Sequence, residues 1–305
     1  HARADAGSQR SHRQAMSLDT YCVMGNPVEH SRSPWIHSRF AALTGHTLQY
    51  TRQCVPLDGF AQAVHAFAQA GGHGCNVTVP FKREAAQCAT TRSERVQLAA
   101  AANTLLFQNG AIHADNTDGL GLVADIQRNA NLPLAGRDVL LVGAGGAAAG
   151  ALGPLLHAGP RRVAVVNRTA ARAQALVQAH APLAALQKTE LLALDIQGLE
   201  HDFDIIINAT SSSLSGAGIP VPARVLRPGC LAYDMMYGNA AQPFLDWAAR
   251  HGARPRDGLG MLVEQAAEAF ALWRGVRPPS AQVLAELRSA MASGPAAVFR
   301  RTHRR

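Results

Sequence analysis

Residues 138–150 read Asp138-Val-Leu-Leu-Val-Gly143-Ala-Gly145-Gly146-Ala-Ala-Ala-Gly150, which predicts a buried strand, a glycine-rich turn and a helix. The run 139–142 is apolar at every position, as in a parallel strand that is covered on both faces. An Ala/Leu-rich helical pattern follows over about residues 147–158. Glycines let a backbone approach a pyrophosphate, and a helix N-terminus offers free N–H groups and positive dipole. The stretch predicts a dinucleotide site, although Gly-x-Gly alone is nearly as often a structural turn.

The next apolar run, residues 162–166, is followed by Asn167, Arg168 and Thr169. In dinucleotide-binding folds the residue at this place meets the adenine ribose, and an Asp or Glu there accepts the 2′-hydroxyl of NAD. An amide, a guanidinium and a hydroxyl stand here instead, with Arg172 one helical step later, and these groups favour the 2′-phosphate of NADP. A solvated loop arginine is the alternative. We predict that the cofactor is NADP.

Length and charge define the class of protein. At 305 residues the chain can form two domains, each with a core of its own. No apolar run approaches the roughly 18 residues of a membrane-spanning helix. The formal net charge is +8, but residues 1–15 contribute +2 and the four arginines after residue 299 contribute +4. Because the rest is nearly neutral, we expect no nucleic-acid partner and no membrane partner, and we expect disordered tails at 1–16 and 293–305.

The cysteine pattern indicates the compartment. The five cysteines are odd in number and form no C-x-x-C pair, so they are typical of free thiols in a reducing compartment. The N-terminal segment contains no apolar core of a secretion signal. We therefore expect a cytoplasmic protein without disulfide bonds and without a metal site.

Two serines stand at a predicted helix start. A strand is expected over residues 18–24, and Ser33 followed by Pro34 then predicts a helix with serine as its N-cap. Ser31 and Ser33 at a helix N-terminus can also hold a small carboxylate. Capping alone would explain Ser33 and leave Ser31 without a role. On the residues alone the two interpretations are even.

A lysine follows another predicted strand. Residues 75–79 alternate so that Asn76 and Thr78 point to one side, and Lys82 comes just past the strand. Of the 29 lysines and arginines in the chain, only Lys82 and Lys188 are lysines. Lysine can gain and lose a proton in a protein, whereas arginine cannot. Lys82 is therefore a candidate proton donor, and a structural lysine paired with a carboxylate is the alternative.

The remaining pattern indicates how the domains are joined. A polar run at residues 115–119 predicts the crossing into the dinucleotide domain, with a helix over 120–128 after it. Apolar strands over 204–208 and 231–234 end in polar turns, which places function at the carboxyl edge of a parallel sheet. A helix after Gly258 carries Gln265, and a helix from residue 280 closes the fold.

Eight motifs in order give the chain a resemblance to the shikimate dehydrogenase family over about residues 21–288. They are Gly25-Asn-Pro-Val-Glu-His-Ser-Arg-Ser-Pro34, Asn76-Val-Thr-Val-Pro-Phe-Lys82, Ala102-Asn-Thr-Leu105, Asp115-Asn-Thr-Asp-Gly119, Gly143-Ala-Gly-Gly-Ala147, Asn167-Arg-Thr-Ala-Ala-Arg172, Asn208-Ala-Thr-Ser211 and Gly258-Leu-Gly-Met-Leu-Val-Glu-Gln-Ala266. The resemblance implies an α/β fold of two domains. These are an N-terminal α/β substrate-binding catalytic domain (17–118) and a Rossmann-like, doubly wound NADP-binding domain (119–255), with C-terminal helices (256–292) that return to the substrate domain.

The resemblance also implies the reaction, which is the reversible NADPH-dependent reduction of 3-dehydroshikimate to shikimate in chorismate and aromatic amino-acid biosynthesis. Lys82 would give a proton to the developing alkoxide, and Asp118 would orient it. The implied substrate-binding residues are Ser31, Ser33, Asn76, Thr78, Lys82, Asn103, Asp118, Tyr237 and Gln265. The implied cofactor-binding residues are Glu94, Gly143, Ala144, Gly145, Gly146, Ala147, Asn167, Arg168, Thr169, Arg172, Met235 and Gly258.

The chain departs from the family pattern at a few positions, which include Ser213 in place of a glycine and Gln242 in place of a threonine. Three other functions are weighed against the first. A quinate/shikimate dehydrogenase that uses NAD is disfavoured because no acid stands near Arg168. A folate-linked dehydrogenase would not need the two serines, and a non-catalytic NADP-binding sensor would not need both Lys82 and Asp118. A homodimer is our candidate assembly.

Overall fold

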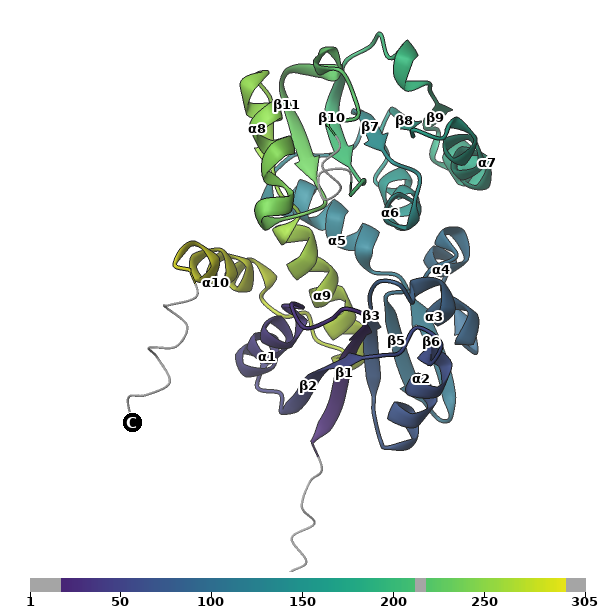
Figure 1. Ribbon diagram of the computed structural model, residues 1–305, viewed down its shortest axis with the longest axis vertical. Helices are drawn as coiled ribbons and strands as arrows, with labels where there is room; N and C mark the ends of the chain where they lie inside the picture. The colour runs from purple at the N-terminus through teal and green to yellow at the C-terminus, as the bar shows by residue number, and fades with distance from the viewer. Residues whose placement is uncertain (1–17, 212–217, 295–305) are drawn as a thin grey trace, which may run out of the picture.

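The computed structural model describes residues 18–211 and 218–294, which form two α/β domains (Figure 1). Each domain is built on a six-stranded sheet, and the helices α5 (Asp118–Ala124) and α9 (Leu259–Arg274) lie between the two sheets. Ser213 lies outside the described residues, as do the expected tails except for residues 293 and 294. The two-domain α/β architecture expected from the sequence is confirmed.

The N-terminal sheet is mixed, with the strand order β2-β1-β3-β5-β6-β4. Strand β1 pairs in parallel with β2 and β3, whereas β5 is antiparallel to both β3 and β6. The β5–β6 hairpin turns at Asn109 and Gly110, whose φ angles of 53° and 76° suit the two-residue turn that Asn-Gly favours. The elements are β1 (Asp19–Gly25), α1 (Ser33–Thr44), β2 (Leu48–Cys54), α2 (Phe60–Gln69), β3 (Gly74–Val77), α3 (Lys82–Cys88), β4 (Thr91–Arg92), α4 (Glu94–Ala99), β5 (Thr104–Gln108) and β6 (Ala111–Asp115).

The second sheet is parallel throughout, and its order β12-β11-β10-β7-β8-β9 is that of a doubly wound dinucleotide fold. The all-apolar run of β7 is buried on both faces. Val139 and Leu141 pack with α6, while Leu140 and Val142 pack on the side of α8. The elements are β7 (Asp138–Val142), α6 (Gly146–His157), β8 (Arg162–Val166), α7 (Ala170–Gln187), β9 (Glu190–Ala193), β10 (Phe203–Asn208), β11 (Leu226–Asp234), α8 (Gln242–Arg250) and β12 (Arg254–Arg256).

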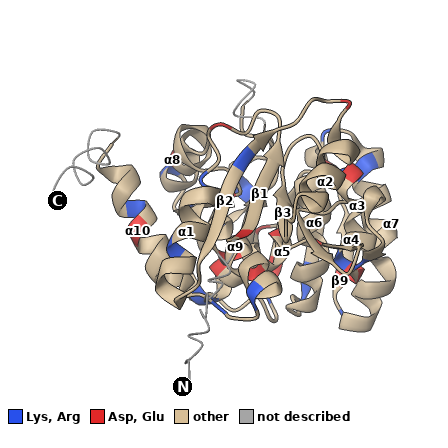
Figure 2. Ribbon diagram, turned by 90° about the horizontal axis from the view of Figure 1, so that it is seen from below, with Lys and Arg blue, Asp and Glu red and all other residues tan. Residues whose placement is uncertain are grey.

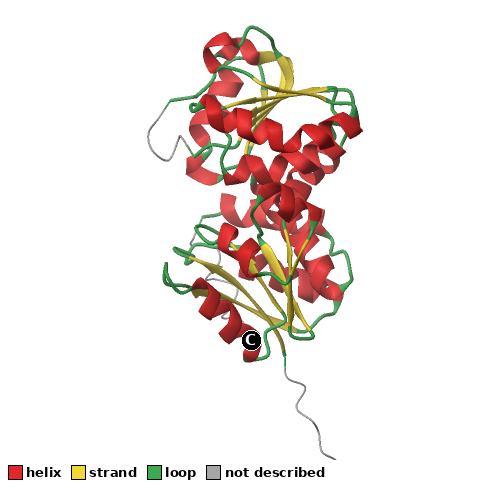
Figure 3. Cartoon of the chain, turned by 90° about the vertical axis from the view of Figure 1, so that its right-hand side faces the viewer, coloured by secondary structure: helices red, strands yellow, loops and turns green. Residues whose placement is uncertain are grey.

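The C-terminal helices return to the N-terminal domain, as expected. Helix α9 packs against α1, and α10 (Ser280–Ala292) packs on both (Figure 1). Figure 3 shows the two domains from the side, each with helices around its sheet. Their shared core contains Phe40 of α1, Phe270 of α9 and Leu284 of α10, all buried. This packing fixes the first half of α9, which carries Gln265, against the N-terminal domain.

Two local predictions differ from the structure. Strand β3 ends at Val77, and Val79 is 66% exposed, because the chain turns where the Asn26 N–H donates to the Val79 carbonyl over 3.0 Å. The helix expected over 120–128 begins earlier, at Asp118, and continues as a π-helical segment, η1 (Asp125–Asn129).

Positively and negatively charged residues are mixed over the described part of both domains, which agrees with the nearly neutral body of the chain (Figure 2). Among the helices of the described residues, none is both long enough and apolar enough to cross a membrane.

A buried ion pair joins η1, the second sheet and α9. Asp125 is fully buried, and it accepts hydrogen bonds from Arg256 Nε (2.9 Å), Arg256 Nη2 (2.7 Å) and the Tyr233 hydroxyl (2.8 Å). A Cβ atom at Gly260 would lie 1.9 Å from Asp125 Oδ1, so α9 comes this close only because residue 260 is a glycine. The Asp125 carboxylate is therefore enclosed by three segments of the fold.

We expect Arg256→Met to lower the free energy of unfolding by about 3–5 kcal/mol, because it leaves the Asp125 charge buried with only the neutral donors of Tyr233 and Asn129. Urea denaturation monitored by circular dichroism measures the change. Arg250→Met, at an exposed arginine that ends α8, is the matched control and should stay within about 0.5 kcal/mol of the parent protein. Equal stability of the two variants would show that the pair contributes little.

Candidate active site

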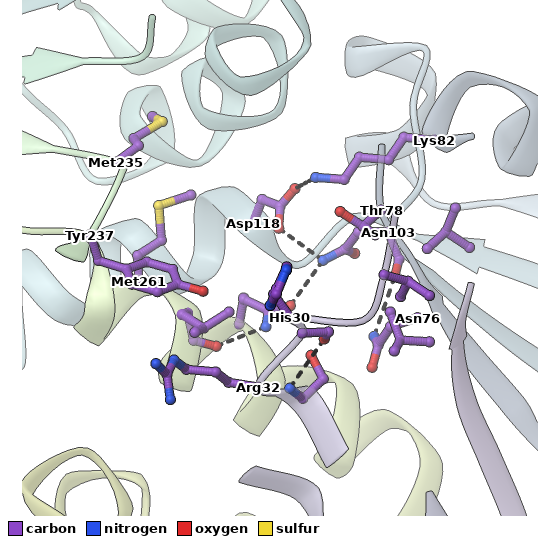
Figure 4. Close-up of a pocket in the computed structure, with 18 of the residues that line it drawn as sticks. His30, Arg32, Asn76, Thr78, Lys82, Asn103, Asp118, Met235, Tyr237 and Met261 are labelled. Atoms are coloured by element: carbon purple, nitrogen blue, oxygen red, sulfur yellow. Dashed lines mark hydrogen bonds and ion pairs between the residues drawn. The ribbon is translucent and has the colours of Figure 1, made fainter. Parts of the chain in front are cut away.

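A pocket of about 390 Å³ lies between the two domains, and all nine residues expected to bind the substrate line it. They come from the loop before α1 and the first residue of α1, the end of β3 and the residue after it, α3, the segment before β5, α5, α9 and the loop after β11 (Figure 4). Met235 and Gly258, two of the expected cofactor residues, line the same pocket. The remaining cofactor residues lie elsewhere, at the dinucleotide turn and on neighbouring segments.

The central feature of the pocket is an ion pair. Lys82 is the first residue of α3, Asp118 is the first residue of α5, and Lys82 Nζ lies 2.7 Å from Asp118 Oδ2 (Figure 4). The other oxygen, Oδ1, accepts a hydrogen bond from Asn103 Nδ2 over 3.0 Å. The side chains of Lys82 and Asp118 are 34% and 17% exposed, so the lysine is still accessible from the pocket. An ammonium group held in this way can donate a proton to a bound molecule.

The polar run 115–119 connects the two domains, and hydrogen bonds also anchor it at both ends. Asp115 accepts two hydrogen bonds from Arg95, at 3.1 and 2.9 Å. Two residues later, the Thr117 hydroxyl donates to the backbone carbonyl of Gln265 over 3.0 Å. The loop is therefore tied to α4 on one side and to α9 on the other. These bonds fix the position from which Asp118 enters the pocket.

The Asn76 amide in the pocket is oriented by residues that do not themselves line the pocket. Asn76 accepts a hydrogen bond from the buried Tyr50 hydroxyl over 2.7 Å, and its Nδ2 donates to Thr104 Oγ1 over 3.1 Å. The Tyr50 ring stacks on His37, with centroids 4.5 Å apart and planes at 5°. Burial lowers the pKa of His37 to about 3, so this imidazole is neutral at physiological pH. Neither Tyr50 nor His37 was identified from the sequence, since a buried polar group inside a strand or helix gives no local signal.

The predicted capping role of Ser33 is wrong. Ser33 is the first residue of α1, and the N-cap position belongs to Arg32, whose side chain makes no capping hydrogen bond. The Ser33 N–H instead donates to the Ser31 hydroxyl oxygen over 3.3 Å. The helix starts one residue earlier than Pro34 suggests, because proline is tolerated throughout the first turn. Ser31 therefore has a local structural role of its own.

Eight further residues line the pocket and were not predicted as site residues, and four of them are His30, Arg32, Met261 and Leu262. The first two stand inside the same short motif as the two serines. Met261 and Gln265 are four residues apart in α9 and so share one face of the helix. Helical spacing could therefore have found Met261 in the sequence.

The turn after β7 has the features of a dinucleotide cradle. Gly143 has a φ of 115°, and its N–H donates to the Val166 carbonyl over 2.8 Å, which holds the turn beside the end of β8. A Cβ atom at Gly145 or Gly146 would meet nothing within 4 Å, so the space above the turn is open. Among residues 18–211 and 218–294 no side chain caps the N-terminus of α6, so the first N–H groups of this helix can bind an anion. These residues fit a pyrophosphate.

The segment after β8 completes this region. Asn167 Nδ2 donates to the Thr169 carbonyl over 3.1 Å, which shapes the loop. Arg168 and Arg172 are exposed, and within the described ranges neither one forms an ion pair. Free guanidinium groups at the carboxyl end of a strand next to a glycine-rich turn fit the extra phosphate of NADP. Glu94 is exposed at the start of α4, which packs against α6, and it does not line the pocket.

A buried carboxyl group holds the loop after β11. Asp234 accepts hydrogen bonds from the Met236 N–H over 2.9 Å and from Asn208 Nδ2 over 3.5 Å. Burial raises the pKa of Asp234 to about 6, against these hydrogen bonds, which lower it. The loop that it holds presents Met235 and Tyr237 to the pocket. The departure at Gln242 lies outside the pocket, because its amide is exposed on α8 and donates to Asp246 over 2.7 Å.

Three family models match successive parts of the chain. They are the shikimate dehydrogenase substrate binding domain (residues 23–105), shikimate / quinate 5-dehydrogenase (125–215) and the shikimate 5′-dehydrogenase C-terminal domain (258–288). A shikimate dehydrogenase (NADP(+)) from Acidovorax sp. (strain JS42) is 77% identical over 278 residues, which cover 91% of this chain and 99% of that protein.

Solved structures agree with this match. An Ael1 enzyme from Pseudomonas putida is 46% identical, with a TM-score of 0.82, and covers 88% of this chain and 98% of its own. Shikimate 5-dehydrogenase from Thermus thermophilus, in complex with NADP(H) and shikimate, is 29% identical, with a TM-score of 0.79, over 90% and 100% of the two chains. Since the family models follow one another along the chain and the relatives match over nearly their whole length, the protein belongs to the shikimate dehydrogenase family.

Proposed function

We propose that the protein is an NADP-dependent shikimate dehydrogenase, which catalyses the reversible, NADPH-dependent reduction of 3-dehydroshikimate to shikimate. The observation that carries this proposal is the Lys82–Asp118 pair, with Nζ 2.7 Å from Oδ2. The pair lies inside a pocket between the N-terminal domain and a domain with the strand order of a dinucleotide-binding fold. A protein that only binds NADP has no need for an accessible lysine held by a carboxylate in such a pocket.

The cofactor and the residues of the chain supply different parts of the reaction. Bound NADPH supplies a hydride to the carbonyl carbon. The Lys82 ammonium supplies the proton and stabilises the negative charge that develops on the carbonyl oxygen. Asp118 aims the Lys82 ammonium, and Asn103 holds Asp118 over 3.0 Å. In the oxidative direction neutral Lys82 accepts the proton from the hydroxyl group.

The layout of the pocket suits a small ring with hydroxyl groups at one end and a carboxylate at the other. Lys82 and the amides of Asn103 and Asn76 lie on one side of the pocket, with Thr78 beside them (Figure 4). The loop that contains the two serines is marked in Figure 4 by His30 and Arg32, and Arg32 lies on the side away from Lys82. We propose that the hydroxyl groups bind at the Lys82 side and the carboxylate at the serine loop.

The cofactor would bind to the second domain. The turn 143–147 would hold the pyrophosphate, and the segment 167–172 would hold the adenosine with its 2′-phosphate. Met235 and Gly258 would lie at the nicotinamide, because they line the substrate pocket. Glu94 would contact the cofactor from α4.

We also propose the division of the chain into a substrate-binding catalytic domain (17–118), an NADP-binding domain (119–255) and C-terminal helices (256–292). A cytoplasmic location and a homodimer are further proposals from the sequence. Sedimentation of the purified protein measures its mass in solution and tests the dimer.

We expect Lys82→Ala to lower kcat by at least about a hundredfold while shikimate still binds, the scale of a lost general acid. Lys82→Arg should be equally slow, since an arginine keeps the charge and does not release a proton. Steady-state kinetics with shikimate and NADP+ measure both variants. Lys188→Asn, at the only other lysine, is the control and should keep parental turnover. An Arg variant with parental kcat would show that charge alone is needed.

We expect Arg168→Ala to raise the KM for NADP+ about ten- to a hundredfold, because a charge-assisted bond to the 2′-phosphate is worth about 1.5–3 kcal/mol. The KM for NAD+ should hardly change, since NAD+ has no such phosphate, and this makes NAD+ the internal control. Arg172→Ala should show the same pattern to a smaller degree. An equal loss with both cofactors would assign Arg168 a structural role.

We expect Ser31→Ala to raise the KM for shikimate several-fold and to lower the free energy of unfolding by about 0.5–1 kcal/mol. The second effect arises because the Ser31 hydroxyl accepts the Ser33 N–H at the start of α1. Kinetics and urea denaturation separate the two effects. Ser38→Ala, at an exposed serine of the same helix, is the control for both. A variant that is less stable but keeps the parental KM would make Ser31 a cap only.

A further inference from the structure

The charges that line the pocket do not cancel. Among the lining residues, Lys82, Asp118 and Arg32 carry formal charges, besides the imidazole of His30. Lys82 and Asp118 neutralise each other across 2.7 Å. Arg32 has no carboxylate partner anywhere in residues 18–211 and 218–294. The described lining of the pocket thus holds one uncompensated positive charge, and it lies at Arg32.

Arg32 lies on the side of the pocket away from Lys82. Its side chain points toward the loop of Tyr237, which belongs to the other domain (Figure 4). Burial raises the pKa of Tyr237, and the charge of Arg32 acts in the opposite direction, in agreement with the position of both side chains on the same side of the pocket (Figure 4). A ligand group bound here would meet both domains.

Helix stability does not explain this arginine. Arg32 occupies the N-cap position of the twelve-residue helix α1, and its side chain forms no cap. A positive charge at a helix N-terminus is repelled by the helix dipole. An anion bound at this place would satisfy the N-terminus and the guanidinium together. The position therefore favours a ligand with a negative charge.

We propose that Arg32 is a specificity-determining residue whose guanidinium is the cationic partner of the substrate carboxylate, beside the Ser31 and Ser33 hydroxyls. This inference rests on the proposed function, which supplies the carboxylate. Serine and tyrosine hydroxyls are neutral, and a carboxylate that leaves water for a pocket needs an opposite charge. The planar guanidinium also matches the two oxygens of a carboxylate. The other end of the pocket then serves the reaction, while this end selects ring acids over neutral polyols.

The test compares Arg32→Gln with Arg32→Lys. We expect Arg32→Gln to raise the KM for shikimate about tenfold or more, with kcat within about threefold and the KM for NADP+ unchanged. Arg32→Lys should keep a large part of the affinity, because it keeps the charge. Arg83→Gln is the matched control. Arg83 is exposed in the same domain, does not line the pocket and has no ion-pair partner within the described ranges, so its loss should leave all three constants unchanged.

Two further measurements test whether Arg32 recognises the negative charge of the substrate carboxylate, and thermal unfolding serves as a check on the fold. The carboxamide of shikimate is neutral, so Arg32→Gln should change its KM by less than about twofold. Salt should weaken shikimate binding to the parent protein, measured by calorimetry, more than binding to Arg32→Gln. Thermal unfolding should be unchanged or slightly higher for Arg32→Gln, since a repulsion at the helix end is removed.

The outcomes separate the two proposals. An active parent enzyme whose Arg32→Gln variant keeps the parental shikimate KM overturns the role of Arg32 and leaves the function standing. An equal rise in the KM for shikimate and in the KM for its carboxamide also overturns it, because Arg32 then does not recognise the charge of the carboxylate. A parent protein that neither binds shikimate nor oxidises it with NADP+ overturns the proposed function, and the assignment of Arg32 fails with it.

Discussion

The geometry of the site depends on how one loop is tied down. Lys82 and Asp118 begin two different helices, and they meet at 2.7 Å only because the residues before Asp118 are bonded to α4 on one side and to α9 on the other. The same loop leads directly into α5, which lies between the two sheets. A shift of this loop would therefore move the carboxylate, the crossing between the domains and the face of α9 that carries Gln265. An ion pair that is partly exposed is weak by itself, so its precision must come from these buried hydrogen bonds.

Buried polar groups recur wherever the two domains meet. Asp125 is enclosed by Arg256 and Tyr233 and by the bare backbone of Gly260, and Asp234 fixes the loop that carries Met235 and Tyr237. Such groups contribute little net stability, but they are costly to misplace, because each partner left unpaired would stay desolvated. They therefore specify one arrangement of the domains more than they strengthen it. A pocket lined from both domains needs this kind of specification.

The sequence predicted the fold well where the signal is local. The all-apolar β7 and the helix after Gly258 both follow from runs of adjacent residues. All nine residues predicted to bind the substrate line one pocket, because short motifs carry them. The sequence missed what depends on distant contacts. Tyr50 on β2 orients Asn76 on β3 across the one strand, β1, that lies between them, and the Ser31 hydroxyl accepts the Ser33 N–H next to the N-cap position at Arg32. Neither contact leaves a pattern within a window of a few residues.

The distribution of charge indicates how an anionic substrate is recognised. The body of the chain is nearly neutral, so a long-range field does little to attract a carboxylate at physiological salt, where charges beyond about 8 Å are screened. Recognition must then be local. Among the described residues, the pocket meets this need with one balanced pair at Lys82 and Asp118 and one free cation at Arg32, on opposite sides. Had Asp118 been absent, Lys82 would compete for the carboxylate and the ring could bind in the reverse direction. In the proposed function, the acid that aims Lys82 would also remove its attraction for the wrong end of the substrate, so that the same ion pair would serve both catalysis and orientation.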